Sequence, residues 1–159
     1  MMAEINPGDM APDATLTTPE GGTLKLSQLR GKPLVLYFYP KDDTSGCTRE
    51  AQDFSRFKGA FDIAGVAILG VSKDPPAKHV KFTAKYDLTI SLASDEDGSV
   101  CVAFGTWIEK SLYGRKYMGI DRATFLIDAD GRVAKVWRKV KVPGHAEAVL
   151  AAAEELVRA

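Results

Sequence analysis

Two continuous apolar runs constrain the fold of this chain more than any other feature of its sequence. Residues 34–39 read LVLYFY, and residues 63–71 read IAGVAILGV. Runs of this kind, without polar alternation, are typical of central strands that are covered on both faces. Between them, residues 48–61 carry apolar side chains at helical spacing with charged residues in the intervals. The sequence therefore predicts two buried strands of one sheet, separated by an amphipathic helix.

Shorter segments complete such a sheet. Residues 14–26 alternate Thr and Leu around Pro-Glu-Gly-Gly, which indicates an N-terminal β-hairpin. A second hairpin is predicted from residues 122–128 and 133–138, which flank a turn containing Gly131. The other expected elements are a helix at residues 75–86, a short strand at 88–93, one or two helical turns at 100–104 and an Ala-rich helix at 143–158. This order predicts an α/β or α+β fold, with a mixed sheet and helices on both faces.

Length and composition limit the class of protein. The chain has 159 residues, and we expect residues 1–159 to form one domain with a sizeable core. Lys plus Arg and Asp plus Glu each total 21, so nucleic acid is not expected as the main partner. Neither a secretory signal nor an apolar run of membrane-spanning length is recognisable. The two cysteines, Cys47 and Cys101, favour a reducing cytoplasmic location over a disulfide scaffold.

Cys47 occupies a position where a cysteine becomes reactive. It follows the buried strand at residues 34–39 after a polar loop, and it falls at the start of the predicted helix. Open α/β sheets bind ligands at the carboxyl ends of their strands. The first amide groups of a helix have no partner within the helix, and together with the helix dipole they favour an anion. We therefore predict that Cys47 is a nucleophile, reacting as its thiolate.

Three residues before Cys47 fit this chemistry. Gly46 allows a small substrate to lie close to backbone N–H groups. Thr44 offers a hydroxyl that can donate one hydrogen bond and accept another. Pro40 fixes the exit of the strand and removes a competing N–H donor. Residues 40–47 are therefore predicted to bind a small substrate beside the thiol.

The same residues carry a family resemblance. Pro40, Thr44 and Cys47 form the pattern P-x-x-x-T-x-x-C, which resembles the peroxidatic motif of peroxiredoxins. Residues 113–128, YGRKYMGIDRATFLID, and residues 137–145, WRKVKVPGH, are similar to segments of the bacterioferritin comigratory protein, or peroxiredoxin Q, branch. The likeness extends over nearly the whole chain. It implies a thioredoxin-like fold and adds an arginine, Arg122, to the active-site set.

The resemblance implies a thiol-dependent peroxidase that reduces hydrogen peroxide and organic hydroperoxides in antioxidant defence. The Cys47 thiolate would attack one peroxide oxygen and become a sulfenic acid. Thr44 and the backbone N–H groups of Gly46 and Cys47 would bind the two oxygens. Arg122 would stabilise the thiolate and the charge that develops on the leaving oxygen. Neither a metal nor an organic cofactor is implied, and relatives of this branch are monomers or dimers, so we expect a monomer or a weak dimer.

The sequence departs from this branch where a resolving cysteine is usual. Gln52 stands five residues after Cys47, and Thr83 stands at the other usual position, in the predicted helix. Cys101 is flanked by apolar residues, which favours a packed small side chain over a resolving role. We therefore expect a one-cysteine cycle in which thioredoxin, glutaredoxin or glutathione reduces the sulfenic acid. Resolution by Cys101 stays open as the alternative.

Other functions fit the residues less well. A thiol–disulfide oxidoreductase would carry a second cysteine two or three residues from Cys47, and none stands there. A Cys–His hydrolase or a zinc site would need signature residues or ligand spacing around His79 and His145, which are absent. A non-enzymatic redox sensor remains a candidate. We expect His79 on an exposed helix face and His145 at a helix start.

Two further expectations concern the surroundings of the site. The basic and aromatic stretch at residues 107–117 is predicted to be a mobile loop beside the active site. The alternative role for Arg122 is a surface salt bridge, with Asp121 or Asp42 as its partner.

Overall fold

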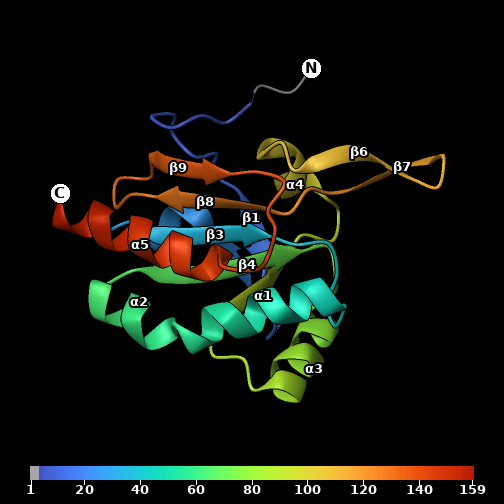
Figure 1. Cartoon of the computed structure of the whole chain (residues 1–159), viewed down its shortest axis with the longest axis horizontal. Coiled ribbons are helices and arrows are strands. Elements are labelled where there is room, and N and C mark those ends of the chain that lie inside the picture. The colour runs from blue at the N-terminus through green and yellow to red at the C-terminus, as the bar shows by residue number, and fades with distance from the viewer. Residues whose placement is uncertain (1–3) are drawn as a thin grey trace.

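The structure, a computed structural model, describes residues 4–159 and is built on a seven-stranded mixed sheet (Figure 1). The strands are β1 (Thr15–Thr17), β2 (Thr23–Lys25), β3 (Leu34–Phe38), β4 (Ala67–Ser72), β5 (Ser91–Ser94), β8 (Ala123–Ile127) and β9 (Val133–Trp137). They lie in the order β2-β1-β5-β4-β3-β8-β9. The helices are η1 (Leu26–Leu29), α1 (Ser45–Arg56), α2 (Lys58–Ala64), α3 (Pro76–Tyr86), α4 (Ser99–Ala103) and α5 (His145–Arg158). None of these helices is long and apolar enough to cross a membrane.

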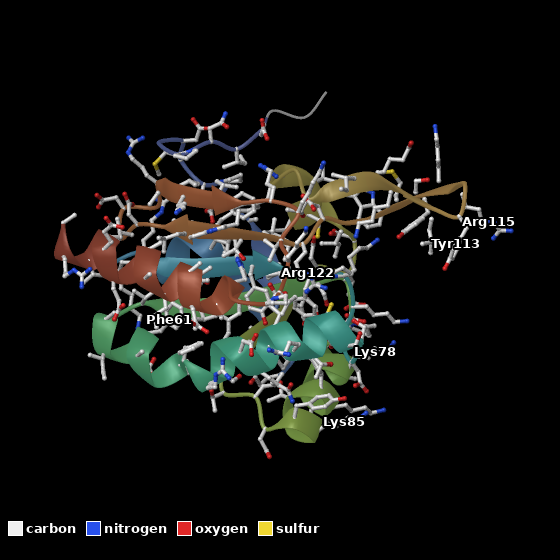
Figure 2. All side chains as sticks on the ribbon, viewed as in Figure 1. Phe61, Lys78, Lys85, Tyr113, Arg115 and Arg122 are labelled. Atoms are coloured by element: carbon white, nitrogen blue, oxygen red, sulfur yellow. The ribbon has the colours of Figure 1, made fainter. Side chains whose placement is uncertain are left out.

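A second, two-stranded sheet projects from the body of the molecule (Figure 1). It consists of β6 (Trp107–Leu112) and β7 (Arg115–Ile120), joined by Tyr113 and Gly114. Both joining residues have positive φ, 51° and 78°, as the two-residue turns that suit a twisted hairpin require. Figure 2 shows Tyr113 at the far end. The prediction of a loop at residues 107–117 was therefore wrong, because Tyr-Gly is not one of the dipeptides that usually signal such a turn.

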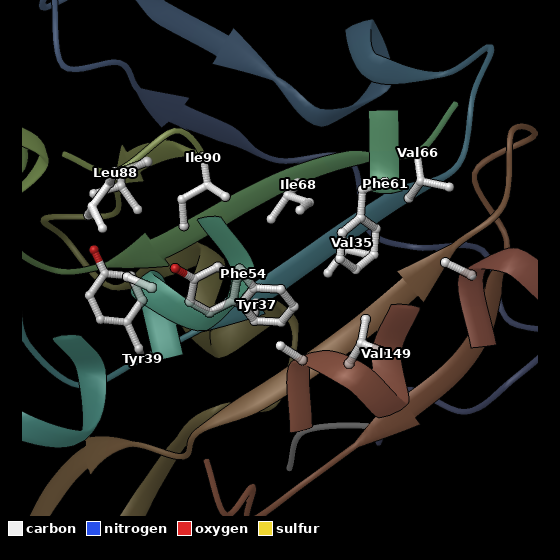
Figure 3. Packing of buried hydrophobic residues seen from close by; sticks show 14 of the residues in the cluster. Val35, Tyr37, Tyr39, Phe54, Phe61, Val66, Ile68, Leu88, Ile90 and Val149 are labelled. Atoms are coloured by element: carbon white, nitrogen blue, oxygen red, sulfur yellow. The ribbon is translucent and has the colours of Figure 1, made fainter. Parts of the chain in front are cut away.

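Strand β3 separates two cores, one on each face of the sheet. Val35 and Tyr37 point into the core that α1, α2 and α5 cover, part of which is seen in Figure 3. Leu34, Leu36 and Phe38 point the opposite way, into the core beside η1 and α4. None of these five residues is more than 4% exposed, which explains the unbroken apolar run. Because β3 pairs in parallel with β4 and antiparallel with β8, the sheet is mixed.

The predicted architecture is confirmed, including both hairpins of the main sheet, the helices α3 and α5, and helices on both faces. The helical turns expected at residues 100–104 are α4. The strand expected at residues 88–93 starts later, as β5, because the preceding residues end α3. Asp87 takes a left-handed φ of 51°, and Leu88 N donates to Thr83 O at 3.0 Å.

Two further boundaries differ from the prediction, and the backbone gives the reason. The single helix expected at residues 48–61 is divided at Phe57, whose φ and ψ are −93° and 4°. The strand expected at residues 63–71 begins only after Gly65, whose left-handed φ of 75° ends α2. Ile63 consequently lies on a helix and is 90% exposed. An apolar run alone did not distinguish the end of a helix from the start of a strand.

Candidate active site

The loop after β3 brings Cys47 to the carboxyl end of the central strands, in the first turn of α1 as predicted. Thr44 is the N-cap, and its carbonyl accepts the first helical hydrogen bond from Thr48 N at 2.8 Å. The amides of Gly46 and Cys47 precede this bond and therefore have no acceptor within the helix. The positive end of the helix dipole lies at the same place. Cys47 is only 2% exposed, so its sulfur is sheltered from water beside these amides.

Arg122 reaches Cys47 from a distant part of the chain. It lies between β7 and β8, and its Nη2 donates to Cys47 Sγ at 3.3 Å. Its Nη1 donates to Glu50 Oε1 at 2.6 Å, so the guanidinium bridges the thiol and a carboxylate. Figure 2 shows Arg122 in the body of the molecule. The alternative of a surface salt bridge with Asp121 or Asp42 was wrong, because the ion pair formed is the buried one with Glu50.

Glu50 is the site residue that sequence reasoning missed. It lies one turn after Cys47 on α1, is 1% exposed, and its Oε2 has no hydrogen-bond partner among the described residues. Burial raises the pKa of Glu50 to about 7, although the Arg122 guanidinium opposes this change. For Arg122, burial alone would lower the pKa, but the charges of Glu50 and Cys47 outweigh burial and raise it. The guanidinium is therefore held charged beside the sulfur.

The other predicted site residues surround this bridge. A Cβ atom at residue 46 would lie 3.2 Å from Arg122 Nη2, so Gly46 leaves the room that the guanidinium occupies. Thr44 Oγ1 donates to Lys41 O at 2.8 Å, which turns the hydroxyl proton away and leaves its lone pairs free to accept. Pro40 is exposed and lies just beyond the end of β3. Pro40 thus begins the loop, while Gly46 and Arg122 are in direct proximity.

A buried histidine anchors this loop to α3. His79 Nδ1 lies 2.7 Å from Asp42 Oδ2, and Tyr39 Oη donates to the other oxygen, Oδ1, at 2.6 Å. His79 Nε2 lies 3.0 Å from Ala93 O on β5. His79 is 0% exposed, so its predicted place on an exposed helix face was wrong. The physical reason is that His79 and Phe82 share the face of α3 that packs on the sheet, three residues apart.

The next residue provides a second anchor. Asp43 has a left-handed φ of 59°, which is uncommon for a residue with a side chain. Its carboxylate accepts hydrogen bonds from Lys85 Nζ, at 2.8 Å, and from Tyr86 Oη. The hydrogen bond from Lys85 lowers the pKa of Asp43. Asp42 and Asp43 together bind the loop before Cys47 to one helix.

Cys101 lies on the other side of the sheet from this arrangement. It is on α4, is 0% exposed and belongs to the core on the η1 and α4 side of the sheet. Cys47 belongs to the other core, and both thiols are free. Burial, and next a hydrogen bond with Asp95, raise the pKa of the Cys101 thiol well above its usual value. These surroundings are typical of a packed core cysteine.

His145 is the first residue of α5, as predicted. It is 7% exposed, and its Nε2 lies 2.8 Å from Thr124 Oγ1. Burial lowers the pKa of His145 to about 4, and the charge of Arg122 acts in the same direction. His145 is therefore neutral near pH 7 and supports the packing behind α1, where it contacts Phe54 edge-on.

In the part of the chain that the structure describes, no group of three His, Cys, Asp or Glu residues is placed to hold a metal ion.

A mixed sheet with helices on both faces, carrying a sheltered thiol at a helix start beside an arginine, defines a thiol-dependent redox enzyme of thioredoxin-like architecture. Residues 7–136 match the family model described as the AhpC/TSA family, and the chain belongs to this family. Over 146 residues it is 49% identical to a putative peroxiredoxin bcp of Coxiella burnetii, with 92% of this chain and 97% of the relative covered. Peroxiredoxin Bcp of Bacillus subtilis is 48% identical over 141 residues, which cover 89% and 90% of the two chains.

Solved structures support the same assignment. One concerns the alkyl peroxide reduction activity of the Xanthomonas campestris bacterioferritin comigratory protein, with a TM-score of 0.88 and 43% identity over 96% of this chain and 98% of that one. The PrxQ of Xylella fastidiosa has a TM-score of 0.90 and 38% identity, again over 96% and 98%. The thioredoxin-like fold and the resemblance to the peroxiredoxin Q branch are thus confirmed. The protein is a thiol-dependent peroxidase.

Proposed function

We propose that this peroxidase acts through Cys47, with Arg122, Thr44 and the amides of Gly46 and Cys47 as its catalytic groups. The observation that carries this proposal is the hydrogen bond from Arg122 Nη2 to Cys47 Sγ, 3.3 Å long, at the positive end of α1. A guanidinium cannot lose its proton at neutral pH, so it stabilises the sulfur most when the sulfur is an anion. Pro40 contributes by setting the path of the loop.

The reaction transfers two electrons from sulfur to the peroxide. The Cys47 thiolate attacks one oxygen, so an S–O bond forms while the O–O bond breaks. The other oxygen leaves as hydroxide or alkoxide and takes up a proton to become water or an alcohol. Arg122 and the free amides of Gly46 and Cys47 stabilise the negative charge on that oxygen, and Thr44 accepts from the peroxide O–H. Loss of one such donor in other enzymes costs about 10²–10³ in rate.

The substrates proposed are hydrogen peroxide and organic hydroperoxides, supported by the alkyl peroxide reduction of the Xanthomonas relative. The two free cysteines favour a reducing compartment such as the cytoplasm. The single seven-stranded sheet supports one domain for residues 1–159, of which residues 1–3 lie outside the described part of the chain. The proposed oligomeric state is a monomer or a weak dimer.

We propose a one-cysteine cycle for the return to the thiol. The Cys47 sulfenic acid condenses with an external thiol, RSH, to a mixed disulfide and water. A second thiol then releases RSSR and restores Cys47. Thioredoxin, glutaredoxin and glutathione are the candidate reductants. The location of Cys101 in the opposite core favours this cycle over resolution by Cys101, because a disulfide needs Cα atoms within about 7 Å.

Peroxide consumption with dithiothreitol as reductant tests both parts of the proposal. Cys47→Ser is expected to abolish turnover, and Cys101→Ser is expected to retain it. Mass spectrometry after one equivalent of peroxide is expected to find no Cys47–Cys101 disulfide. Turnover by the Cys47→Ser variant would show that Cys47 is not the peroxide-reactive residue. A Cys47–Cys101 disulfide would show that Cys101 resolves the sulfenic acid and would contradict the one-cysteine cycle.

A further inference from the structure

The projecting β6–β7 hairpin has two chemically different faces. In an antiparallel pair, directly opposed residues share a face, and every second residue along a strand does so too. One face therefore carries the residues Ile108, Lys110, Leu112, Arg115, Tyr117 and Gly119. This face, which we call the cationic face, has two positive charges among apolar side chains and no acidic residue. The opposite face carries Glu109 together with Lys116, whose ammonium lies 3.8 Å from that carboxylate.

Lys110 is the residue of the cationic face on whose charge Arg122 and Cys47 act. A Cβ atom at residue 119 would lie 3.2 Å from Lys110 Cδ, so Gly119 makes room for the lysine stem at the base of the hairpin. β7 continues from this point directly to Arg122. Lys110 is half-buried, and burial lowers its pKa; the charges of Asp121, Arg122 and Cys47 also act on its ammonium.

Unlike Arg122 and Lys116, Lys110 has no carboxylate within ion-pair distance among residues 4–159, and Asp121 acts on its charge only from further away. The ion pairs formed within residues 4–159 include Arg122 with Glu50 and Lys116 with Glu109, but none that involves Lys110. An ammonium without a carboxylate partner, partly withdrawn from water, attracts an anion more strongly than an exposed and paired one. The cationic face thus offers an anion position next to apolar contact area from Tyr117, which is 47% exposed.

We propose that the cationic face binds the thiol that reduces oxidised Cys47, and that this thiol is a small molecule bearing a carboxylate. The inference rests on the proposed one-cysteine cycle, in which the reductant comes from outside. A peroxide is small enough to be bound entirely by the groups around the Cys47 sulfur. A thiol reductant is larger and also contacts the protein surface beside Cys47. Because Cys47 is 2% exposed, a small thiol reaches it with less rearrangement than a protein surface would. Lys110 binds the carboxylate while the thiol sulfur displaces water from the sulfenic acid.

Three thiols of similar size and different charge provide the test: 3-mercaptopropionate, 2-mercaptoethanol and cysteamine, which add a carboxylate, a neutral hydroxyl and an ammonium. The protein is oxidised with one equivalent of peroxide, and loss of the Cys47 sulfenic acid is followed at low salt. Rates are compared per thiolate, because thiol acidity alone changes reactivity. We expect the order anionic, neutral, cationic, with about fivefold between the first two, as one charge interaction near 4 Å that is screened as in bulk water would give.

Lys110→Gln and Lys116→Gln form a matched pair, since each removes one positive charge from the same hairpin but from opposite faces. Lys110→Gln is expected to lower the ratio of the anionic to the neutral thiol about fivefold, and Lys116→Gln to leave the ratio unchanged. Equal rates for the three thiols, or equal effects of the two substitutions, would overturn the inference. If wild-type Cys47 does not form a sulfenic acid at all, the proposed function fails instead, so the two failures are distinguishable.

Discussion

Replacing Glu50 with glutamine is expected to stabilise the protein at alkaline pH and to change its stability little at acidic pH. Glu50 is 1% exposed, and its pKa is about 7 in the folded protein against an ordinary value of 4.5. Because folding raises this pKa, the protonated carboxyl contributes stability that is complete below about pH 4.5 and is lost as the pH rises through about 7. The rise from 4.5 to about 7, at about 1.4 kcal/mol for each pKa unit, amounts to about 3.5 kcal/mol when complete.

Urea unfolding at pH 4.5 and pH 8 measures this difference. Both proteins carry Cys47→Ser, so that ionisation of the thiol does not contribute, and one of them also carries Glu50→Gln. The free energies of unfolding are expected to agree at pH 4.5. At pH 8 the glutamine variant is expected to be more stable by about 3 kcal/mol, a shift of about 1–2 M in the urea midpoint.

The sign of the effect decides between burial and ion pairing as the dominant influence on Glu50. If the attraction of Arg122, 2.6 Å away, outweighed burial, Glu50 would stay ionised to low pH and its removal would destabilise the protein at pH 8. The reasoning would therefore be refuted if the two proteins differed in stability equally at both pH values. It would also be refuted if the protein that retains Glu50 were the more stable one at pH 8. The predicted result would mean that the protein keeps a costly carboxylate in order to hold Arg122.

Two other substitutions test the geometry around the sulfur. Gly46→Ala places a methyl group 3.2 Å from Arg122 Nη2 and is expected to slow Cys47 oxidation about tenfold or more. Gly59→Ala, which has open space around it, is the control and is expected to keep the wild-type rate. Equal rates of the two variants in stopped-flow peroxide assays would contradict this prediction. His79→Asn keeps a donor at the Nδ1 position toward Asp42 and is expected to retain most of the oxidation rate, while His79→Gln, whose nitrogen replaces Nε2, is expected to lose about tenfold. Equal losses in the two His79 variants would show that the Nδ1 contact with Asp42 does not set the oxidation rate.

The parts of the site that lie close together in sequence could be predicted from it. Thr44, Gly46 and Cys47 lie within one turn, so a strand end, a polar loop and a helix start were enough to place them. Arg122 lies 75 residues from Cys47, and only the family resemblance brought it into the site. Glu50 was missed because its role depends on Arg122, although its position one turn after Cys47 was a visible signal.

The errors in the fold prediction share a physical cause, because a local sequence pattern does not show which tertiary contacts a side chain makes. His79 stands among charged neighbours, yet it occupies the same helix face as Phe82 and is therefore buried. Ile63 looked like part of a strand because it is apolar, but Gly65 ends a helix at that point. The separation of Cys101 from Cys47 by the sheet follows from topology, and sequence alone could not supply it.

The most direct test is to identify which sulfur reacts. Reduced protein is treated with one equivalent of hydrogen peroxide in the presence of dimedone, which traps sulfenic acids, and its peptides are analysed by mass spectrometry. The adduct is expected on Cys47 and not on Cys101. An adduct on Cys101, or equal labelling of the two cysteines, would contradict the assignment of Cys47 as the peroxide-reactive residue.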